Sequence, residues 1–209
     1  MPDLDSLLIF IAAGLLLNIT PGPDLLFIIG RSMSQGRAAG IVSALGIGAG
    51  CLFHITTAAL GLSALMLALP FAYDLVRFAG AAYLVYLGLR ALVSRQNALE
   101  VRAVERTSLG KIFRQGVITN ILNPKVALFF LAFLPQFANP VNGPLAPQIL
   151  LLGLIFTFNG TLVCVAVAMA ASRLGEWLKS RYNLTAWLNR LTGGLFIALG
   201  IRLALMVRR

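Results

Sequence analysis

Two ionisable residues of opposite charge lie inside long apolar segments of this 209-residue chain. Asp24 follows Asn-Ile-Thr-Pro-Gly-Pro at 18–23, and Lys125 follows Asn-Ile-Leu-Asn-Pro at 120–124. A charged side chain at the centre of a bilayer costs about 2.5–3.5 kcal/mol on insertion scales, so such residues are candidate functional groups. The structural alternative is an ion pair, or two side chains that reach the membrane interface.

The prolines beside these charges predict that both apolar helices are interrupted. Proline removes a backbone hydrogen bond, and lipid offers no replacement, so such a break persists only beside protein or a water-filled cavity. We expect Thr20 to be the N-cap and Pro21 the first residue of a new half-helix, with Asn123 and Pro124 repeating that arrangement. Each restart then directs bare N–H groups and a positive dipole end into the protein.

The chemistry around the two breaks suits a zwitterion. Lys125 and the half-helix N–H groups would hold a carboxylate, and Asp24 with the Asn18 and Asn120 amides would hold an ammonium group. Asp24 would also exchange a proton, because burial and substrate binding both alter the pKa of a carboxyl group. Competition between proton and ammonium for one carboxylate would give antiport. The residues expected to bind substrate are Asn18, Thr20, Pro21, Gly22, Pro23, Asp24, Asn120, Asn123, Pro124 and Lys125.

Other polar residues within apolar segments have more than one interpretation. His54, the only histidine, is equally suited to proton coupling and to helix packing. Asn159 and Thr161 are explained by a hydrogen bond between helices. Cys51 and Cys164 are typical of small residues in apolar runs and indicate no disulfide framework. We therefore expect no metal and no cofactor.

Composition places the chain in a membrane. Hydrophobic residues make up 59% of it and charged residues 11%, whereas soluble domains are about 45–50% apolar and about 25% charged. The apolar excess must face lipid. The net charge of +10 comes from residues between the apolar runs, where Lys and Arg set orientation and meet anionic lipid headgroups. This distribution argues against a nucleic-acid partner.

Hydropathy predicts an all-α membrane protein with six transmembrane helices in a single domain over residues 1–209. The segments long enough to cross the hydrocarbon layer are roughly 6–30, 39–69, 72–92, 112–135, 147–172 and 187–207. The basic loop at about 93–111 should be cytoplasmic, and Arg31 and Arg37 after the first span agree with this orientation. Both termini would then be external, although Arg208 and Arg209 do not fit. The first segment is expected to be a retained helix and not a cleaved signal.

A faint internal repeat relates the two halves of the chain. Residues 86–92 resemble residues 198–204, which follow 112 positions later, and residues 18–27 resemble residues 120–129. A unit of three spans that is duplicated in tandem must insert its second copy upside down. The sequence thus predicts two inverted three-helix repeats, at about 1–92 and 112–209, with broken first and fourth helices.

These motifs resemble the LysE/RhtB family of bacterial amino-acid exporters. The resemblance rests on Asn-Ile-Thr-Pro-Gly-Pro-Asp at 18–24, on residues 116–125 with Phe129 and Phe130, and on residues 83–90. It covers the whole chain and shows no departure at the first two motifs. It implies export across the inner membrane, coupled to the proton motive force, of an amino acid such as threonine, homoserine, leucine or lysine. Members of such families can form homodimers, which this sequence does not demonstrate.

Three rival functions stay open at this point. The first is a passive channel or another carrier for small zwitterionic or polar metabolites. The second is a membrane enzyme, for which one histidine and two distant cysteines offer little. The third is an assembly partner, in which polar broken helices would serve no purpose. A carboxylate opposite a lysine favours a coupled carrier with alternating access.

Overall fold

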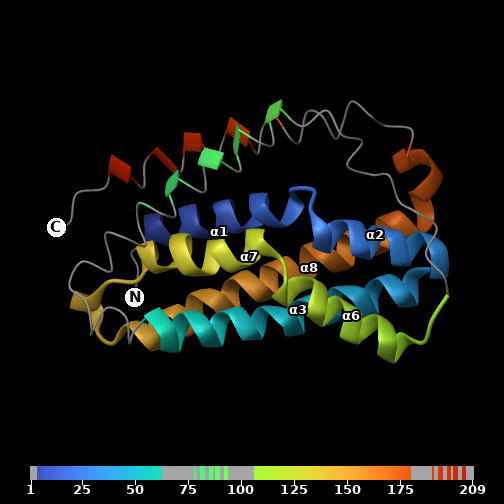
Figure 1. Cartoon of the computed structure of the whole chain (residues 1–209), viewed down its shortest axis with the longest axis horizontal. Helices are drawn as coiled ribbons and strands as arrows, with labels where there is room; N and C mark the ends of the chain where they lie inside the picture. The colour runs from blue at the N-terminus through green and yellow to red at the C-terminus, as the bar shows by residue number, and fades with distance from the viewer. Residues whose placement is uncertain are drawn as a thin grey trace.

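A computed structural model describes the chain over residues 4–62 and 106–179. It also describes helical positions 78, 81–82, 85–86, 88–89, 92–93, 190, 193–194, 197–198, 200–201 and 204–205. The helices run side by side along one long axis, as Figure 1 shows. The first half contains α1 (Leu4–Ile19), α2 (Pro23–Gln35), α3 (Arg37–Thr57) and the π-helical turn η1 (Ala58–Leu62). The second contains α6 (Leu109–Ile121), α7 (Pro124–Leu128), η2 (Phe129–Phe133), η3 (Leu134–Phe137), η4 (Pro140–Asn142) and α8 (Leu145–Lys179).

Two helices are long and apolar enough to cross a membrane unaided, namely Arg37–Gly61 and Leu145–Arg173. Two bent pairs also qualify when each is taken as one span. The first joins α1 to α2 at 52°, and the second joins α6 to the helical stretch beginning at Pro124 at 48°. The described residues therefore supply two to four spans. The segments expected at 72–92 and 187–207 lie largely outside the described residues.

The break between α1 and α2 lies two residues later than the sequence predicted. α1 ends at Ile19, Gly22 is the N-cap in extended backbone (φ −177°, ψ −178°), and α2 begins at Pro23. The expectation that Thr20 is the N-cap and Pro21 the first helical residue was wrong. A residue that precedes proline is disfavoured in α-helical backbone, so the second proline delays the helix. The Thr20 hydroxyl instead donates to the Leu16 carbonyl oxygen at 2.5 Å.

The break between α6 and α7 has the predicted form. Asn123 is the N-cap and Pro124 is the first helical residue. The Asn123 side-chain oxygen accepts a hydrogen bond from the Lys125 backbone N–H at 3.0 Å, as an N-cap should. Asp24 and Lys125 thus occupy equivalent places, each one residue after the proline that opens its half-helix.

Glycines bring α3 and α6 into backbone contact. A Cβ added at Gly46 would lie 2.4 Å from the Phe113 carbonyl oxygen, and one added at Gly116 would lie 2.9 Å from that of Ser43. A Cβ at Gly50 would lie 2.8 Å from the Asn120 Cβ. Any larger residue at these positions would force the two helices apart. This close packing fixes Asn120, which follows in α6, at the centre of the protein.

A buried polar network joins the end of α2 to the start of α6. Arg31 was expected to follow the first span, which was wrong: it lies within α2 and is 5% exposed. Its guanidinium donates to the side-chain oxygens of Gln35 at 2.9 Å and Gln115 at 2.8 Å. The Gln35 amide also exchanges two hydrogen bonds with the Thr107 backbone, at 2.8 and 3.0 Å. Burial of this charge is therefore compensated by polar partners on both helices.

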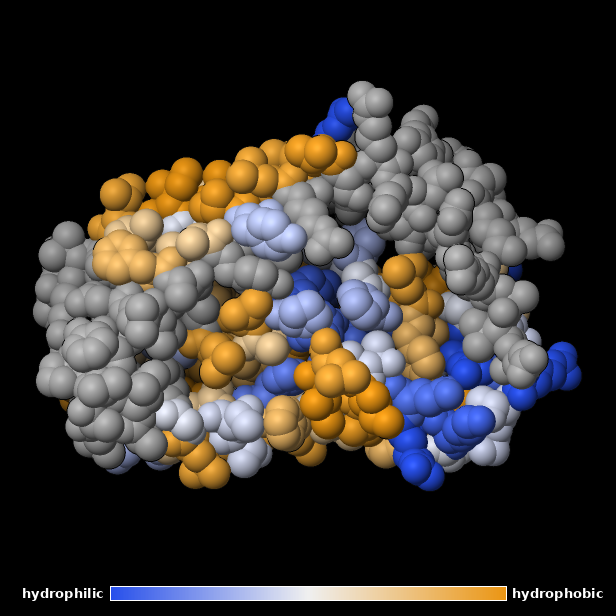
Figure 2. Space-filling view, in the orientation of Figure 1, coloured by the Kyte–Doolittle hydropathy of each residue, from blue (hydrophilic) through white to orange (hydrophobic). Residues whose placement is uncertain are grey.

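Apolar side chains cover the outside of the helices. About half or more of the side chain is exposed at several of them, including Leu45, Phe53, Leu154, Phe158 and Leu162. Figure 2 shows apolar residues on this face, with some hydrophilic residues near its middle and more gathered at the end of the molecule where α2 ends and α6 begins. An apolar girdle with charge at one end is the surface of a protein that lies in a bilayer.

The few described positions from the third and sixth expected spans are helical and pack closely. A Cβ at Gly88 would lie 2.6 Å from the Gly193 carbonyl oxygen, and one at Gly200 would lie 2.8 Å from that of Ala81. Because the later residue of one segment meets the earlier residue of the other, the two segments run antiparallel. They lie side by side in Figure 1.

Candidate functional site

The two helix breaks meet, and each charged residue reaches across to the other break. The Lys125 ammonium donates to the carbonyl oxygens of Leu17 and Thr20, both at 3.0 Å. The Asn120 amide donates to one oxygen of the Asp24 carboxylate at 2.9 Å. Asp24 and Lys125 interact electrostatically, but no direct ion pair joins them among these contacts. The structure therefore brings together the acid, the base and the carboxamide that the sequence singled out.

Proline explains why these particular carbonyls take side-chain partners. Leu17 lies four residues before Pro21, and Asn120 lies four residues before Pro124, so neither carbonyl oxygen receives the usual α-helical bond from the fourth residue along. Each accepts a shorter-range backbone bond instead, from Thr20 at 3.2 Å and from Asn123 at 2.9 Å, and each has room for a side-chain donor. Lys125 supplies a donor to the first. The His54 Nε2 lies 3.0 Å from the Asn120 carbonyl oxygen. Because a carbonyl only accepts hydrogen bonds, this nitrogen must carry the proton.

His54 is held firmly in this position. It is 4% exposed, and its ring stacks on Phe130 with centroids 5.8 Å apart and an interplanar angle of 23°. Its bond to the Asn120 carbonyl oxygen fixes the backbone beside the residue that binds Asp24. This geometry accounts for the histidine as a positioning residue. Proton coupling by His54 stays a prediction.

Several buried polar atoms at the junction lack a protein partner. Within the described part of the chain, they include Asp24 Oδ1, Asn120 Oδ1 and Asn123 Nδ2. The first two are acceptors, since Asn120 must turn its NH₂ toward the carboxylate and its oxygen away. The third is a donor. Buried polar groups in proteins are nearly always hydrogen-bonded, so this set offers both acceptors and a donor to a polar solute.

The other residues predicted at the site line its edges. A Cβ at Gly22 would lie 3.2 Å from the Lys125 Nζ, so glycine leaves room for the ammonium group. Thr20 and Pro21 form the break itself, and Pro23 opens α2 with an exposed ring. Asn18 faces α8, where a Cβ at Gly160 would lie 2.9 Å from its Nδ2.

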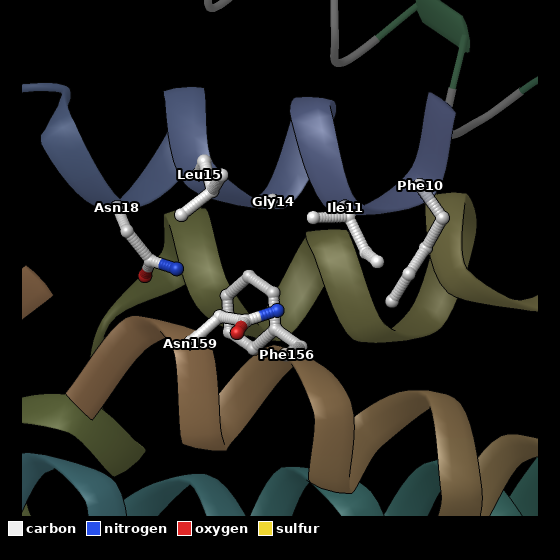
Figure 3. Close-up of a pocket in the computed structure, with 7 residues that line it drawn as sticks. All are labelled: Phe10, Ile11, Gly14, Leu15, Asn18, Phe156 and Asn159. Atoms are coloured by element: carbon white, nitrogen blue, oxygen red, sulfur yellow. The ribbon is translucent and has the colours of Figure 1, made fainter. Parts of the chain in front are cut away.

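A shallow crevice between α1 and α8, lined by Asn18, Asn159 and Phe156 among others, was not predicted from the sequence. Figure 3 shows the Asn18 carboxamide pointing from α1 toward α8, and the Asn159 and Phe156 side chains extending from α8 on the other side. Asn159 was expected to form a hydrogen bond between helices, but within the described residues it forms none. Its position on the face of α8 opposite Asn18 is a tertiary feature that spacing alone did not indicate.

The described residues hold no cluster of three or more His, Cys, Asp or Glu side chains that could bind a metal ion. Cys51 and Cys164 are free thiols, and both are buried. The polar side chains where the two breaks meet are a carboxylate, an ammonium group and carboxamides.

Apolar helices broken around a buried acid and base are typical of membrane transport proteins. The sequence profile of the family described as LysE type translocator matches residues 15–207. The chain belongs to the LysE family, which confirms the resemblance found in its motifs. The family is one of transporters, so the enzyme alternative loses its support. No solved structure matches the chain.

The chain aligns with curated relatives over nearly the whole length of both proteins. The chain is 30% identical over 196 residues to the homoserine/homoserine lactone efflux protein of Salmonella typhimurium, covering 93% of this chain and 94% of the relative. It is 28% identical over 202 residues to an uncharacterized membrane protein of Vibrio cholerae, covering 97% and 98%. It is also 28% identical to the uncharacterized membrane protein YrhP of Bacillus subtilis, covering 96% and 99%.

Proposed function

We propose that this translocator exports a small amino acid of the homoserine and threonine class across the bacterial inner membrane in exchange for protons. The observation that carries the proposal is the set of unpaired acceptors and donors where the two helix breaks meet. An amino-acid zwitterion has an ammonium donor and a carboxylate acceptor a few ångströms apart. It would satisfy both ends of this set at once.

Each polar residue then has a distinct role. Asp24 and the side-chain oxygen of Asn120 accept hydrogen bonds from the substrate ammonium. Lys125 uses two of its three N–H donors on carbonyl oxygens, which leaves one for the substrate carboxylate. The unpaired Asn123 Nδ2 is a second donor for that carboxylate. The remaining members of the predicted set shape the break around these groups.

Coupling to protons follows from competition for Asp24. The carboxylate is charged when it holds the ammonium group, and a proton can replace that group when the substrate leaves. If Asp24 binds the substrate ammonium at one face of the membrane and a proton at the other, each cycle moves substrate and proton in opposite directions. We place the coupling proton on Asp24, with His54 holding the Asn120 backbone beside it.

We further propose six spans arranged as two inverted three-helix repeats. Two pairs of contacts support this. Gly88 and Gly200 lie 112 positions apart, and so do Ala81 and Gly193. The contact of Gly88 with Gly193 therefore has its equivalent in the contact of Gly200 with Ala81. Gly50 of α3 likewise lies against Asn120 of α6, and Gly160 of α8 lies against Asn18 of α1. Asn18 is the equivalent in the first half of Asn120 in the second. Reciprocal contacts of this kind are expected across a two-fold axis.

The substrate class is supported by relatives whose names specify homoserine and homoserine lactone efflux, from Salmonella typhimurium and Salmonella typhi, each 30% identical to this chain. Homoserine and threonine are small zwitterions that carry a side-chain hydroxyl group. Their ammonium and carboxylate groups suit the pairing of Asp24 with Lys125.

The proposal is tested with purified protein in vesicles loaded with labelled homoserine, with and without a pH gradient. We expect the gradient to accelerate efflux in the wild type and to lose this effect in Asp24→Asn. The asparagine can still accept the hydrogen bond from Asn120, so the variant should fold. Asp5→Asn, at the start of α1, is the matched control and should behave as the wild type.

Two results would count against this function. Full gradient coupling in Asp24→Asn would remove the carboxylate from the mechanism. Efflux that is indifferent to the gradient in the wild type, without acceleration by substrate on the opposite side, would favour the passive channel instead.

A further inference from the structure

We propose that α2 is the cytoplasmic gate of the central site and that the buried polar network at its end holds this gate closed. The members of the network are Arg31, Gln35, Thr107 and Gln115. The inference rests on the proposed function and deepens it, because an exporter must admit its substrate from the cytoplasm. Asp24 lies in the first turn of α2 and the network at its last turns, so one short helix connects the charged site to the end of the molecule.

The end of the molecule that carries the network is the cytoplasmic end by the positive-inside rule. Arg37 at the start of α3 and Lys111 and Arg114 of α6 are exposed there. Figure 2 shows hydrophilic residues gathered at this end. A substrate that approaches Asp24 from the cytoplasm along α2 and α6 therefore meets the network first.

Glycines at both ends of α2 allow this helix to turn as a unit. Gly22 precedes it in extended backbone, where α1 and α2 meet at 52°. Gly36 follows it with φ +85°, a backbone region that glycine adopts readily, and a Cβ there would meet nothing within 4 Å. Hinges in proteins are a few residues at the ends of elements that absorb a change in φ and ψ. α2 has such a residue at each end.

Side-chain hydrogen bonds join the end of α2 to α6. The Arg31 guanidinium donates to Gln115 at 2.8 Å, and the Gln35 amide exchanges bonds of 2.8 and 3.0 Å with the Thr107 backbone just before α6. α6 itself packs chiefly on α3, through the close glycine contacts described above. Water can replace hydrogen bonds of this kind when they separate, so their net contribution to closure is modest. α2 can therefore part from α6 while α6 stays on α3.

Aromatic rings close the opposite end of the two broken spans. Phe10 of α1 contacts Phe129 and Phe137, with ring centroids 5.9 and 5.3 Å apart. Phe133 packs on the same two rings, at 5.1 and 5.0 Å. Separating these rings would expose apolar area to water, whereas the groups of the network would gain water as a partner. The contact that water can replace is thus the one at the cytoplasmic end.

The surface that α2 covers contains a thiol that can report the opening. Ile28 of α2 is fully buried in an apolar cluster with residues of α3 and α8, namely Ala44, Ile47, Cys164 and Ala168. Cys164 is 5% exposed and lies close enough to Asp24 and Lys125 to interact with them electrostatically. Movement of α2 away from this surface would therefore admit a thiol reagent to Cys164.

The first test compares alkylation of the two native thiols by N-ethylmaleimide in the full-length protein in vesicles, without substrate. Gln35→Ala removes three hydrogen bonds of the network. We expect Cys164 to react about tenfold faster in this variant, because reaction of a buried group follows the population of the open form. Cys51 is as buried as Cys164 but belongs to the cluster of the aromatic end, so its rate should not change.

Ser34→Ala is the matched control for this measurement. Ser34 precedes Gln35 in α2, and its hydroxyl donates to the Gly30 carbonyl oxygen of the same helix. The variant therefore removes a hydrogen bond within α2 and leaves the network in place. Both thiols should react in it at the wild-type rates.

The second test locks the gate. A reducible bis-methanethiosulfonate reagent that joins Gln35→Cys to Thr107→Cys would hold α2 against the start of α6. Exchange of homoserine should stop on cross-linking and return on reduction. Each single variant treated with the same reagent is the control and should keep its exchange.

An unchanged Cys164 rate in Gln35→Ala, or full exchange by the cross-linked protein, would overturn the gate and leave the proposed export intact. Equal acceleration at both thiols would also overturn it, because a general loosening of the fold would then explain the effect. If the thiols respond as expected but the wild type exchanges no amino acid, the gate stands and the proposed substrate is refuted.

Discussion

Gly50 offers a quantitative test of how the structure positions Asp24. A Cβ added at Gly50 would lie 2.8 Å from both the Asn120 Cβ and the Val117 carbonyl oxygen, whereas ordinary contacts begin at 3.4 Å. Gly50→Ala must therefore move α6 by about 0.6 Å. The Val117 oxygen belongs to the backbone, so rotation of a side chain cannot relieve the contact.

Two consequences follow from a shift of this size. Overpacking of a close contact costs typically about 1–3 kcal/mol, which lowers Tm by about 2–12 °C in a chain of this length. The hydrogen bond from Asn120 to Asp24 is 2.9 Å long, and a 0.6 Å displacement away from Asp24 would bring it near the limit for such a bond. We expect exchange of homoserine to fall about tenfold or more, since a misplacement near 1 Å can cost about 100-fold.

The measurements are thermal unfolding in detergent and counterflow in vesicles. Gly110→Ala is the control, because Gly110 is also in a helix and a Cβ there would meet nothing within 4 Å. It should leave transport unchanged and raise stability slightly, by up to about 1 kcal/mol. A Gly50→Ala protein with wild-type Tm and wild-type exchange would show that the contact between α3 and Asn120 does not position the carboxylate.

Two further substitutions test the buried polar contacts. His54→Gln retains a donor for the Asn120 carbonyl oxygen and should keep gradient-driven exchange and its pH dependence; loss of coupling with an unchanged Tm would instead place the proton on the imidazole. Gln115→Leu removes one partner of the buried Arg31 guanidinium and should destabilise the protein by about 1.5–3 kcal/mol, measured as a fall in Tm. Ile118→Leu, at an exposed position of the same helix, is its control, and an equal Tm for both variants would contradict the importance of the network.

The broken helices and the charged pair were predictable because they depend on local rules. Proline within an apolar run forces a break, and lipid requires the freed carbonyls to find partners inside the protein. These rules placed Asp24 and Lys125 just beyond the two breaks, where the structure has them. The start of α2 was predicted at Pro21 but lies at Pro23. Pro23 disfavours α-helical backbone at the residue before it, so Gly22 is extended and the helix begins after it.

The remaining errors concern residues whose environment depends on distant parts of the chain. Arg31 read as a loop charge because the sequence does not show that Gln35 and Gln115 surround it. The role of Asn159 depends on which helix faces α8, and that choice is set by packing between halves. His54 could be assigned to neither packing nor coupling until its neighbour, the Asn120 carbonyl, was known.

The two halves of the molecule pack unequally, and one position accounts for the difference. In the proposed repeat, Gly14 corresponds to Gly116, 102 positions later, and Gly46 corresponds to Phe156, 110 positions later. Gly116 lies against the α3 backbone at Gly46, but Gly14 meets the Phe156 ring. An aromatic ring thus stands where the other half has a glycine.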